Sequence, residues 1–369
     1  DAARPESPGG GTVLFVDGRA HVYHTTAEQR EEAGTPDLAG AVRLGLCVRV
    51  RETIGTATIA ARTAHIAALV RAHNWGAAAS RALLFFPEGN TSGAGNTAGG
   101  NTAGASCAAA GCAGEEPVAL PVLAFVVWCA PLGRFLHHDF VCAVLNDLFG
   151  VQARGGCLCA GPHVWALLGI APDTVARLRA ALVGARHALG DIIARTRDRS
   201  DLGLEVYRPG VVRVTLHWAM RDADVRFVLD AVAFVAQHAW RLLPAYELVP
   251  QTGTWRHRAH WKAAEDANRV ALGTFSVREE QEEQQEEQAT PQEPLTHAQC
   301  LAQAETLCEA CARDLRSHRL HVTEFNDEDV AGVDTHELRD LRWFATPFDS
   351  AQYILKGVVP PHQPPLFCA

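Results

Sequence analysis

The chain has 369 residues, of which 48% are hydrophobic and 20% charged, so it can bury a sizeable core and form two domains of about 100 to 200 residues each. A formal net charge of −9 argues against a nucleic acid partner, because nucleic-acid-binding surfaces are basic. No apolar run approaches the roughly 20 residues of a membrane-spanning helix, so we expect no membrane partner, and the eleven scattered cysteines indicate a reducing, intracellular compartment.

Residues 1–52 read as the trailing part of a large domain. The chain starts at Asp1 without an initiator methionine, and its one methionine is Met220, so we expect it to belong to a longer protein. Alternating apolar residues predict strands over 12–16 and 20–23, joined by an Asp-Gly turn. Apolar residues then recur at helical spacing from Leu38 to Val50, which predicts a helix.

Residues 53–250 read as a smaller α/β domain, because predicted helices and strands alternate along them. The predicted elements are a helix over 56–74, strands over 82–86 and 118–127, a helix over 138–149, a strand over 151–153, a helix over 173–197, a strand pair 204–207 and 211–218 turned by Pro209-Gly210, and a helix from Asp222. Residues 89–117 interrupt the pattern with a tract of small residues that cannot form a core, so we predict a disordered insert.

Residues 251–295 form an acidic linker in this interpretation, with a Glu/Gln run at 279–288, and residues 296–369 form a C-terminal extension. Its pattern predicts a helix over 301–315 and a segment at 338–344 that docks on the domain. Cys308 and Cys311 suit a zinc site, but their helical spacing favours packing as small apolar residues. For His137 and His138 we likewise favour capping or packing over metal binding.

The segment Arg154-Gly155-Gly156-Cys157-Leu158-Cys159-Ala160-Gly161-Pro162 is the most informative part of the sequence. Glycines permit a tight turn, and Pro162 opens a predicted helix, so Cys159 lies on an accessible loop near a helix start, where a thiolate is favoured. Cys159 is therefore a candidate nucleophile. The alternative is a structural thiol on a loop that gates the substrate.

Together with Glu32-Ala33-Gly34-Thr35-Pro36 and the strand from Gly210 to Leu216, this segment resembles the C-terminal part of class V, fold-type I pyridoxal-phosphate enzymes, which include aminotransferases and cysteine desulfurases. The resemblance covers about residues 9–258 without the insert. It implies an α/β fold made of the end of the cofactor-binding large domain and the small C-terminal domain. It also implies a homodimer.

The resemblance assigns a role to each motif. Gly34 and Thr35 bind the cofactor phosphate across the dimer, where a backbone amide and a hydroxyl are suited to that group. Arg213, with Arg154 nearby, binds the carboxylate of an amino-acid substrate, because a guanidinium is a planar, two-pronged donor. Cys159 accepts sulfur if the enzyme is a desulfurase-like lyase. Cys157 and Leu158 stand where desulfurases usually carry histidines, so an aminotransferase remains the other reading.

The family forms a Schiff base between pyridoxal phosphate and a lysine, but Lys262 and Lys356 are the only lysines in this sequence and lie late in it. We therefore expect that lysine in an N-terminal half that precedes Asp1. The hypothesis from a different class is a non-catalytic remnant that serves as a dimerisation or partner-binding module.

Overall fold

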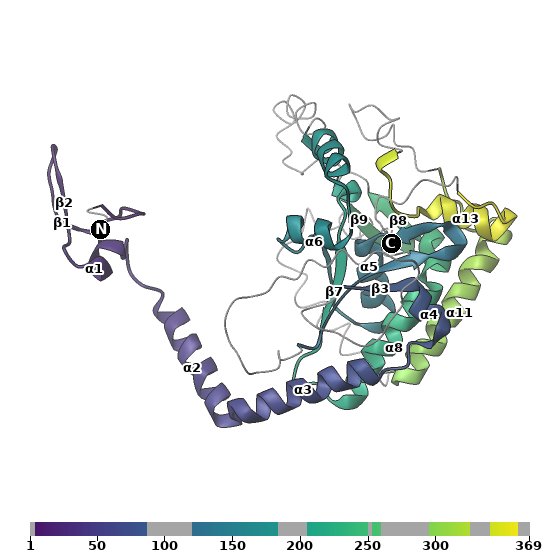
Figure 1. The fold of residues 1–369 in the computed structure, drawn as a ribbon, viewed down its shortest axis with the longest axis horizontal. Coiled ribbons are helices and arrows are strands. Elements are labelled where there is room, and N and C mark those ends of the chain that lie inside the picture. The colour runs from purple at the N-terminus through teal and green to yellow at the C-terminus, as the bar shows by residue number, and fades with distance from the viewer. Residues whose placement is uncertain are drawn as a thin grey trace, which may run out of the picture. The chain divides into compact units, whose positions relative to one another are not determined.

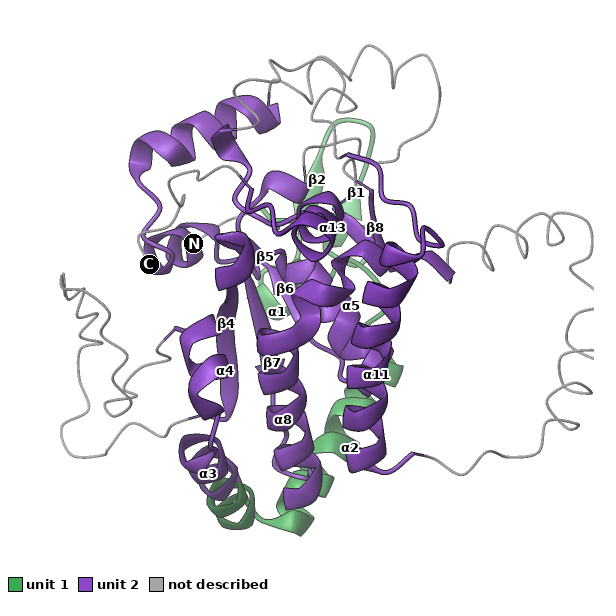
Figure 2. Ribbon diagram, turned by 90° about the vertical axis from the view of Figure 1, so that its right-hand side faces the viewer, with its two compact units in different colours: residues 1–62 green, residues 63–369 purple. Residues whose placement is uncertain are grey.

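The computed structural model describes residues 4–86, 120–183, 205–249, 253–259, 295–324 and 340–360. These residues form a mixed α/β structure with open sheets. The chain divides into two compact units, residues 1–62 and residues 63–369 (Figure 2). The expected insert at 89–117 and the acidic run at 279–288 lie outside the described residues. None of the described helices combines the length and the apolar character that crossing a membrane requires.

The first unit contains a hairpin and helices (Figure 1). Strands β1 (Val13–Val16) and β2 (His21–Tyr23) pair in antiparallel fashion, as the sequence predicts, and are followed by α1 (Ala27–Glu31) and α2 (Leu38–Ile54). Helix α2 begins at Asp37, whose Oδ1 accepts a hydrogen bond of 2.8 Å from the amide of Gly40. It ends at Gly55, whose φ of +88° few other residues adopt. No residue of α2 is buried.

The second unit is built on an antiparallel sheet. Its strand order is β3 (Leu83–Phe85), β4 (Val122–Cys129), β7 (Val211–Thr215) and β6 (Arg154–Gly156), and β5 (Arg134–Leu136) pairs with the end of β4. Apolar residues of β4 and β7 lie opposite each other on one face, where Leu123 faces Val214 and Phe125 faces Val212, and all four are buried. This face forms the core of the unit.

Helices of the second unit provide the rest of the core. They are α3 (Thr56–Ala72), which spans the boundary between the units, α4 (Gly76–Ala82), α5 (His138–Phe149) and α8 (Asp222–His238). Helix α5 has the predicted bounds and buries Phe140, Val141, Val144 and Leu145, an apolar stripe at helical spacing. Helix α8 contacts both α4 and α11 (His297–Arg316), and Figure 2 shows the three side by side.

The C-terminal extension packs on the same unit. Capping boxes begin α11 at Thr296 and α13 (Pro347–Lys356) at Thr346, and both helices contact the 3-10 segment η3 (Ala239–Ala245). Between these helices, Phe344 bridges to Phe135 of β5, and the indole N–H of Trp343 donates to the carbonyl of Tyr207 at 3.1 Å. Residues 343–345 are buried, so the end of the predicted docking segment is part of the core.

Several predicted elements differ from the structure. The strand expected at 151–153 forms at Arg154–Gly156 instead. The expected strand pair turned by Pro209-Gly210 does not form, because β7 pairs with β4 and β6, and Glu205–Tyr207 is a 3-10 turn (η2). The helix expected at 173–197 begins at residue 172 and is described only as far as residue 183. Strands β8 (Tyr246–Val249) and β9 (Thr254–His257) form a second hairpin.

Candidate functional site

The structure places Arg154 and Arg213 directly opposite each other in the neighbouring strands β6 and β7. Directly opposed residues of an antiparallel pair lie on the same face, and two like charges there repel. Within the described parts of the chain, neither guanidinium forms an ion pair with a carboxylate. Arg213 is half-buried and Arg154 is exposed, so this face presents two positive side chains with no carboxylate partner among the residues that the structure describes.

Strand β6 reaches this position because Gly155 lies against the first turn of α5. A Cβ atom on Gly155 would lie 2.9 Å from Nδ1 of His138 and 3.4 Å from Sγ of Cys142, and it would overlap the carboxylate of Asp139. The absence of a side chain therefore lets β6 pack directly on α5. This contact holds the neighbouring Arg154 in register with Arg213.

The loop after β6 carries Cys159 in a strained turn. The amide of Ala160 donates to the carbonyl of Cys157 at 2.8 Å, which closes a turn with Leu158 and Cys159 at its centre. These two residues have φ angles of +54° and +62°, a left-handed conformation that costs a residue with a side chain about 1–2 kcal/mol. Such strain persists where the surroundings hold it, and it clusters at functional sites.

Cys159 lies beside Arg154. The Nη2 atom of Arg154 is 4.0 Å from Sγ of Cys159, and the cysteine is exposed. A neighbouring guanidinium stabilises negative charge on sulfur. Helix α6 (Gly161–Leu167) follows at once, slightly earlier than the sequence predicts. The strand register and the loop thus bring together three of the five predicted site residues.

Four other cysteines of the second unit have thiol pKa values that are raised by burial. Burial raises the pKa of the Cys129, Cys142 and Cys308 thiols to about 12 and that of Cys311 to about 11, so these four remain protonated near neutral pH.

Gly34 and Thr35 belong to the first unit and are described by themselves. Both are exposed in the turn between α1 and α2, and the amide of Gly11 donates to the carbonyl of Ala33 at 3.5 Å. Within the described residues, the hydroxyl of Thr35 makes no hydrogen bond. Gly34 and Thr35 lie in the first unit, whereas Arg154, Arg213 and Cys159 lie in the second.

His137, His138 and Asp139 form a cluster whose possible metal-ligand atoms lie within 4.8 Å of one another. Nδ1 of His137 accepts the amide of Asp139 at 3.1 Å and so caps α5, and Nε2 lies 3.1 Å from the carbonyl of Val206. His138 places Nε2 3.3 Å from the carbonyl of Arg208 and Nδ1 3.0 Å from Asp139 Oδ1. His137 therefore caps α5, as predicted, and both of its ring nitrogens are engaged.

Burial determines the protonation of this cluster. It lowers the pKa of His137 well below its ordinary value, and the charge of His138 adds to this effect, whereas Asp139 and the contact with Val206 oppose it. Burial raises the pKa of Asp139, but its hydrogen bond to His138 and the charges of both histidines outweigh that effect, so the net pKa is lowered. His137 is therefore neutral in the folded state.

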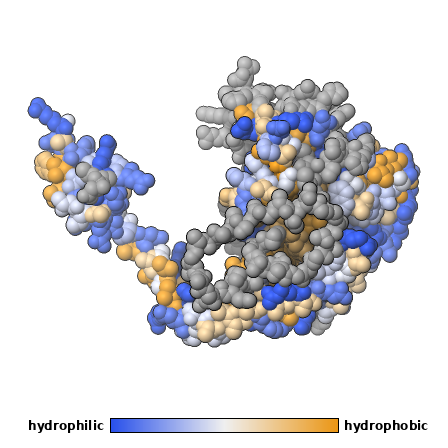
Figure 3. All heavy atoms as spheres, viewed as in Figure 1, coloured by the Kyte–Doolittle hydropathy of each residue, from blue (hydrophilic) through white to orange (hydrophobic). Residues whose placement is uncertain are grey.

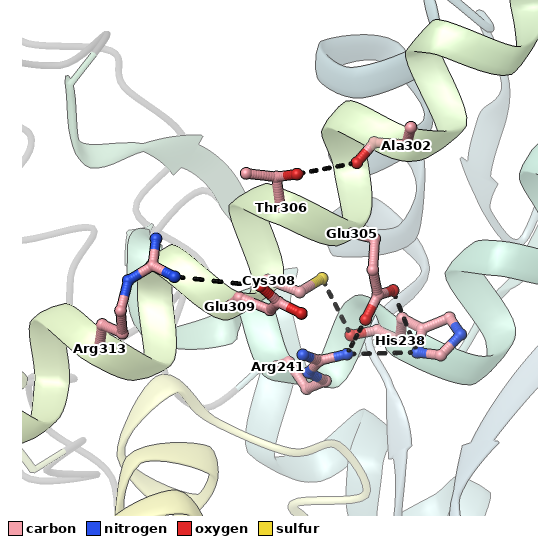
Figure 4. A network of polar contacts seen from close by, with 8 residues as sticks. All are labelled: His238, Arg241, Ala302, Glu305, Thr306, Cys308, Glu309 and Arg313. Atoms are coloured by element: carbon pink, nitrogen blue, oxygen red, sulfur yellow. Dashed lines mark hydrogen bonds and ion pairs between the residues drawn. The ribbon is translucent and has the colours of Figure 1, made fainter.

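Cys308 of α11 lies at the contact with the end of α8 (Figure 4). Sγ of Cys308 points toward the carbonyl of His238 at 3.9 Å, and Arg241 Nη1 pairs with Glu305 Oε1 at 2.8 Å. Cys308 and Cys311 are buried, and within the described residues the histidine cluster is the only group of possible metal ligands. The predicted packing role of these cysteines fits this arrangement.

An open pocket of about 680 Å³ between α5 and β9 was not indicated by the sequence. It is lined by Asp139, Cys142, Ala143, Asn146, Asp147, Gln152, Ala153, Trp255, Arg256 and His257. The hydroxyl of Tyr246 donates to Asp147 at 2.9 Å beside it, and burial raises the pKa of this tyrosine. None of Arg154, Arg213 and Cys159 lines this pocket, and no sequence motif marks it.

Neither a comparison with protein-family models nor a search of curated proteins finds a match for this chain.

Proposed function

We propose that this chain is part of a pyridoxal-phosphate enzyme of class V, fold-type I, and that it acts on an amino acid whose α-carboxylate is held between Arg213 and Arg154. One observation carries this proposal: two arginines lie directly opposite each other on one sheet face, with no carboxylate partner among the described residues, beside an exposed thiol. A carboxylate between them relieves the like-charge repulsion and accepts charge-assisted hydrogen bonds.

The residues of the first unit fit the cofactor's phosphate. Thr35 is exposed, its hydroxyl makes no hydrogen bond within the described residues, and Gly34 leaves the backbone beside it open. We assign the phosphate contact to these two residues of a second copy of the chain. When bound, the cofactor supplies an electron sink for the amino acid. The proposal assigns its lysine to neither Lys262 nor Lys356, because both follow residues 9–258, which carry the resemblance.

Cys159 distinguishes the two reactions within this family. Its exposure, its strained turn and the guanidinium of Arg154 support a nucleophile that accepts sulfur from cysteine, as in a desulfurase-like lyase. In an aminotransferase the same thiol is only a structural group on a loop that controls access of the substrate. Replacing Cys159 with serine in the complete protein separates them, because sulfide output from L-cysteine is lost in the lyase, whereas transamination persists in the aminotransferase.

The carboxylate site is tested with stable conjugates that need no lysine. Phosphopyridoxyl-L-alanine and phosphopyridoxyl-ethylamine differ only in the carboxylate, so the ratio of their dissociation constants isolates its contribution. Charge-assisted hydrogen bonds contribute about 1.5–3 kcal/mol, so we expect the wild type to favour the alanine conjugate about 10- to 150-fold. Arg213→Ala should abolish that preference, and Arg213→Lys should retain part of it. An unchanged preference in Arg213→Ala would refute the assignment.

A specific observation also favours the second candidate, a module that binds a partner or dimerises. Helix α2 carries apolar side chains around most of its circumference, and Figure 3 shows hydrophobic residues on the surface of the first unit. Its Leu38, Val42 and Leu46 are 67%, 64% and 54% exposed. A helix that is apolar on all sides is normally buried. The partner that the family resemblance implies is a second copy of the chain.

The oligomeric state tests this candidate. We expect a dimer in sedimentation equilibrium and a monomer for the double variant Val42→Glu/Leu46→Glu. A double variant on α11, Glu309→Gln/Arg313→Gln, is the matched control, because these residues are exposed polar groups of the other unit. A wild-type monomer at high concentration would contradict the dimer.

A further inference from the structure

The turn that presents Cys159 carries a second thiol, Cys157, for which the proposed function has no role. The two cysteines flank Leu158, and the hydrogen bond from Ala160 to the carbonyl of Cys157 closes the turn around them. In a fully extended chain, the Cα atoms of residues i and i+2 lie up to about 7 Å apart. This is at the upper limit of the roughly 4.4–6.8 Å between the Cα atoms of a disulfide. The positive φ angles of Leu158 and Cys159 fold the chain back, which shortens this separation.

Both thiols are also accessible enough to suit exchange chemistry. Cys159 is exposed and Cys157 is half-buried, whereas burial raises the pKa of Cys129, Cys142 and Cys308 to about 12 and keeps those thiols protonated. Thiolate is the reactive species in such exchange, and Nη2 of Arg154 lies 4.0 Å from Sγ of Cys159. The exposed thiol and the neighbouring guanidinium of Arg154 are thus found at the same turn.

We propose that Cys157 is a resolving thiol, which attacks Sγ of Cys159 when that sulfur is oxidised and forms a Cys157–Cys159 disulfide. With a peroxide as oxidant, the Cys159 thiolate attacks one oxygen, the O–O bond breaks and one water leaves. Cys157 then displaces the hydroxyl from Cys159 as a second water. The two thiols lose two electrons and the peroxide gains them.

The same attack resolves a persulfide, and this part rests on the proposed function, in which Cys159 accepts sulfur. Cys157 displaces the outer sulfur of the persulfide on Cys159, and that sulfur leaves as hydrogen sulfide with the proton of Cys157. The sulfane sulfur is reduced while the two cysteines are oxidised to the disulfide. The site then returns to its thiol form through a dithiol reductant, which is the class of partner that the inference implies.

The peroxide reaction is tested on the full chain without cofactor or amino acid. The reduced protein is treated with hydrogen peroxide in the presence of dimedone, which traps sulfenic acid, and is mapped by mass spectrometry. We expect a peptide 2 Da lighter that contains Cys157 and Cys159, with little dimedone on Cys159. In Cys157→Ser, dimedone on Cys159 should increase at least tenfold.

Cys47 provides the matched control, because it is exposed in the first unit and has no second cysteine near it in sequence. Cys47→Ser should leave the 157–159 disulfide unchanged. Cys157 and Cys47 both lie outside the buried core, and circular dichroism checks the fold of the two variants. The proposal is wrong if wild-type Cys159 takes up as much dimedone as it does in Cys157→Ser, or if the two sulfurs stay reduced while Cys47 reacts.

Sodium tetrasulfide in place of peroxide tests the persulfide reaction. We expect hydrogen sulfide release that falls at least tenfold in Cys157→Ser, while the persulfide on Cys159 persists. Release that does not depend on Cys157 would overturn this part. Since neither reaction uses a carboxylate ligand, a failed disulfide with intact Arg213-dependent binding refutes the resolving thiol alone, and the opposite result refutes the proposed function alone.

Discussion

Replacing His137 with asparagine should remove a pH dependence of stability that this histidine imposes on the second unit. Asparagine also caps helices, so the amide of Asp139 keeps an acceptor, but it does not titrate. Burial holds the pKa of His137 well below its ordinary value, so below about pH 6.5 the unfolded state binds a proton that the folded state does not. The unfolded state then binds more protons, and stability falls as the pH falls.

The magnitude follows from linkage. Each pH unit below the unfolded pKa contributes about 1.4 kcal/mol, so between pH 7 and pH 5 the buried His137 should lower the free energy of unfolding by about 2 kcal/mol. Most carboxylates titrate below this window, and the other histidines are common to both proteins. The difference in slope between wild type and His137→Asn therefore isolates His137.

Urea unfolding followed by tryptophan fluorescence provides the measurement, because all eight tryptophans lie in the second unit. Val206→Ala is the matched control, since Val206 is fully buried and its truncation destabilises the unit while leaving His137 in place. We expect the slope of wild type in Val206→Ala and a flatter slope in His137→Asn. Equal slopes in all three proteins would show that His137 does not resist protonation in the fold.

Two further predictions concern packing. Gly155→Ala should lower the free energy of unfolding by about 1–3 kcal/mol and weaken binding of the alanine conjugate, because its Cβ would press on His138 and Cys142 and displace Arg154. Gly150→Ala is the control, because Gly150 has a φ of +63° and open space around its Cβ, so it should cost about 1–2 kcal/mol of stability without weakening binding. Equal losses of binding in the two variants would contradict the account. Cys308→Ser should lower the free energy of unfolding by about 1–3 kcal/mol, because it buries a hydroxyl in an apolar contact. A chelator should leave the melting temperature of the wild type unchanged. A decrease caused by the chelator would instead indicate a metal at Cys308 and Cys311.

Strongly periodic segments could be predicted from the sequence. The bounds of α5 are those expected from its apolar stripe and from Gly150, and the β1–β2 hairpin follows its Asp-Gly turn. Packing partners determined the rest. Strand β6 contains two glycines with little strand propensity, and it forms because Gly155 packs on α5 and pairs with β7.

The sequence singled out the residues of the candidate site but not the way in which they are arranged. Arg154 and Cys159 lie on one short segment, whereas Arg213 lies far along the chain and joins them only through the β6–β7 register, which no local pattern encodes. The left-handed backbone angles of Leu158 and Cys159 could not be predicted from the sequence either, because glycine is the usual signal for that conformation. The pocket beside Tyr246 depends on residues from α5, from β9 and from the segment before β6, which are separate in the sequence.

The central claim is that Arg154 and Arg213 hold one carboxylate together, and a double-mutant cycle tests it most directly. The preference for phosphopyridoxyl-L-alanine over phosphopyridoxyl-ethylamine is measured in wild type, Arg154→Ala, Arg213→Ala and the double variant. If both guanidiniums contact the same carboxylate, each single variant loses most of the preference and the double variant loses little more, with a coupling of about 0.5–3 kcal/mol. Strictly additive losses, or a preference that survives in the double variant, would contradict the account.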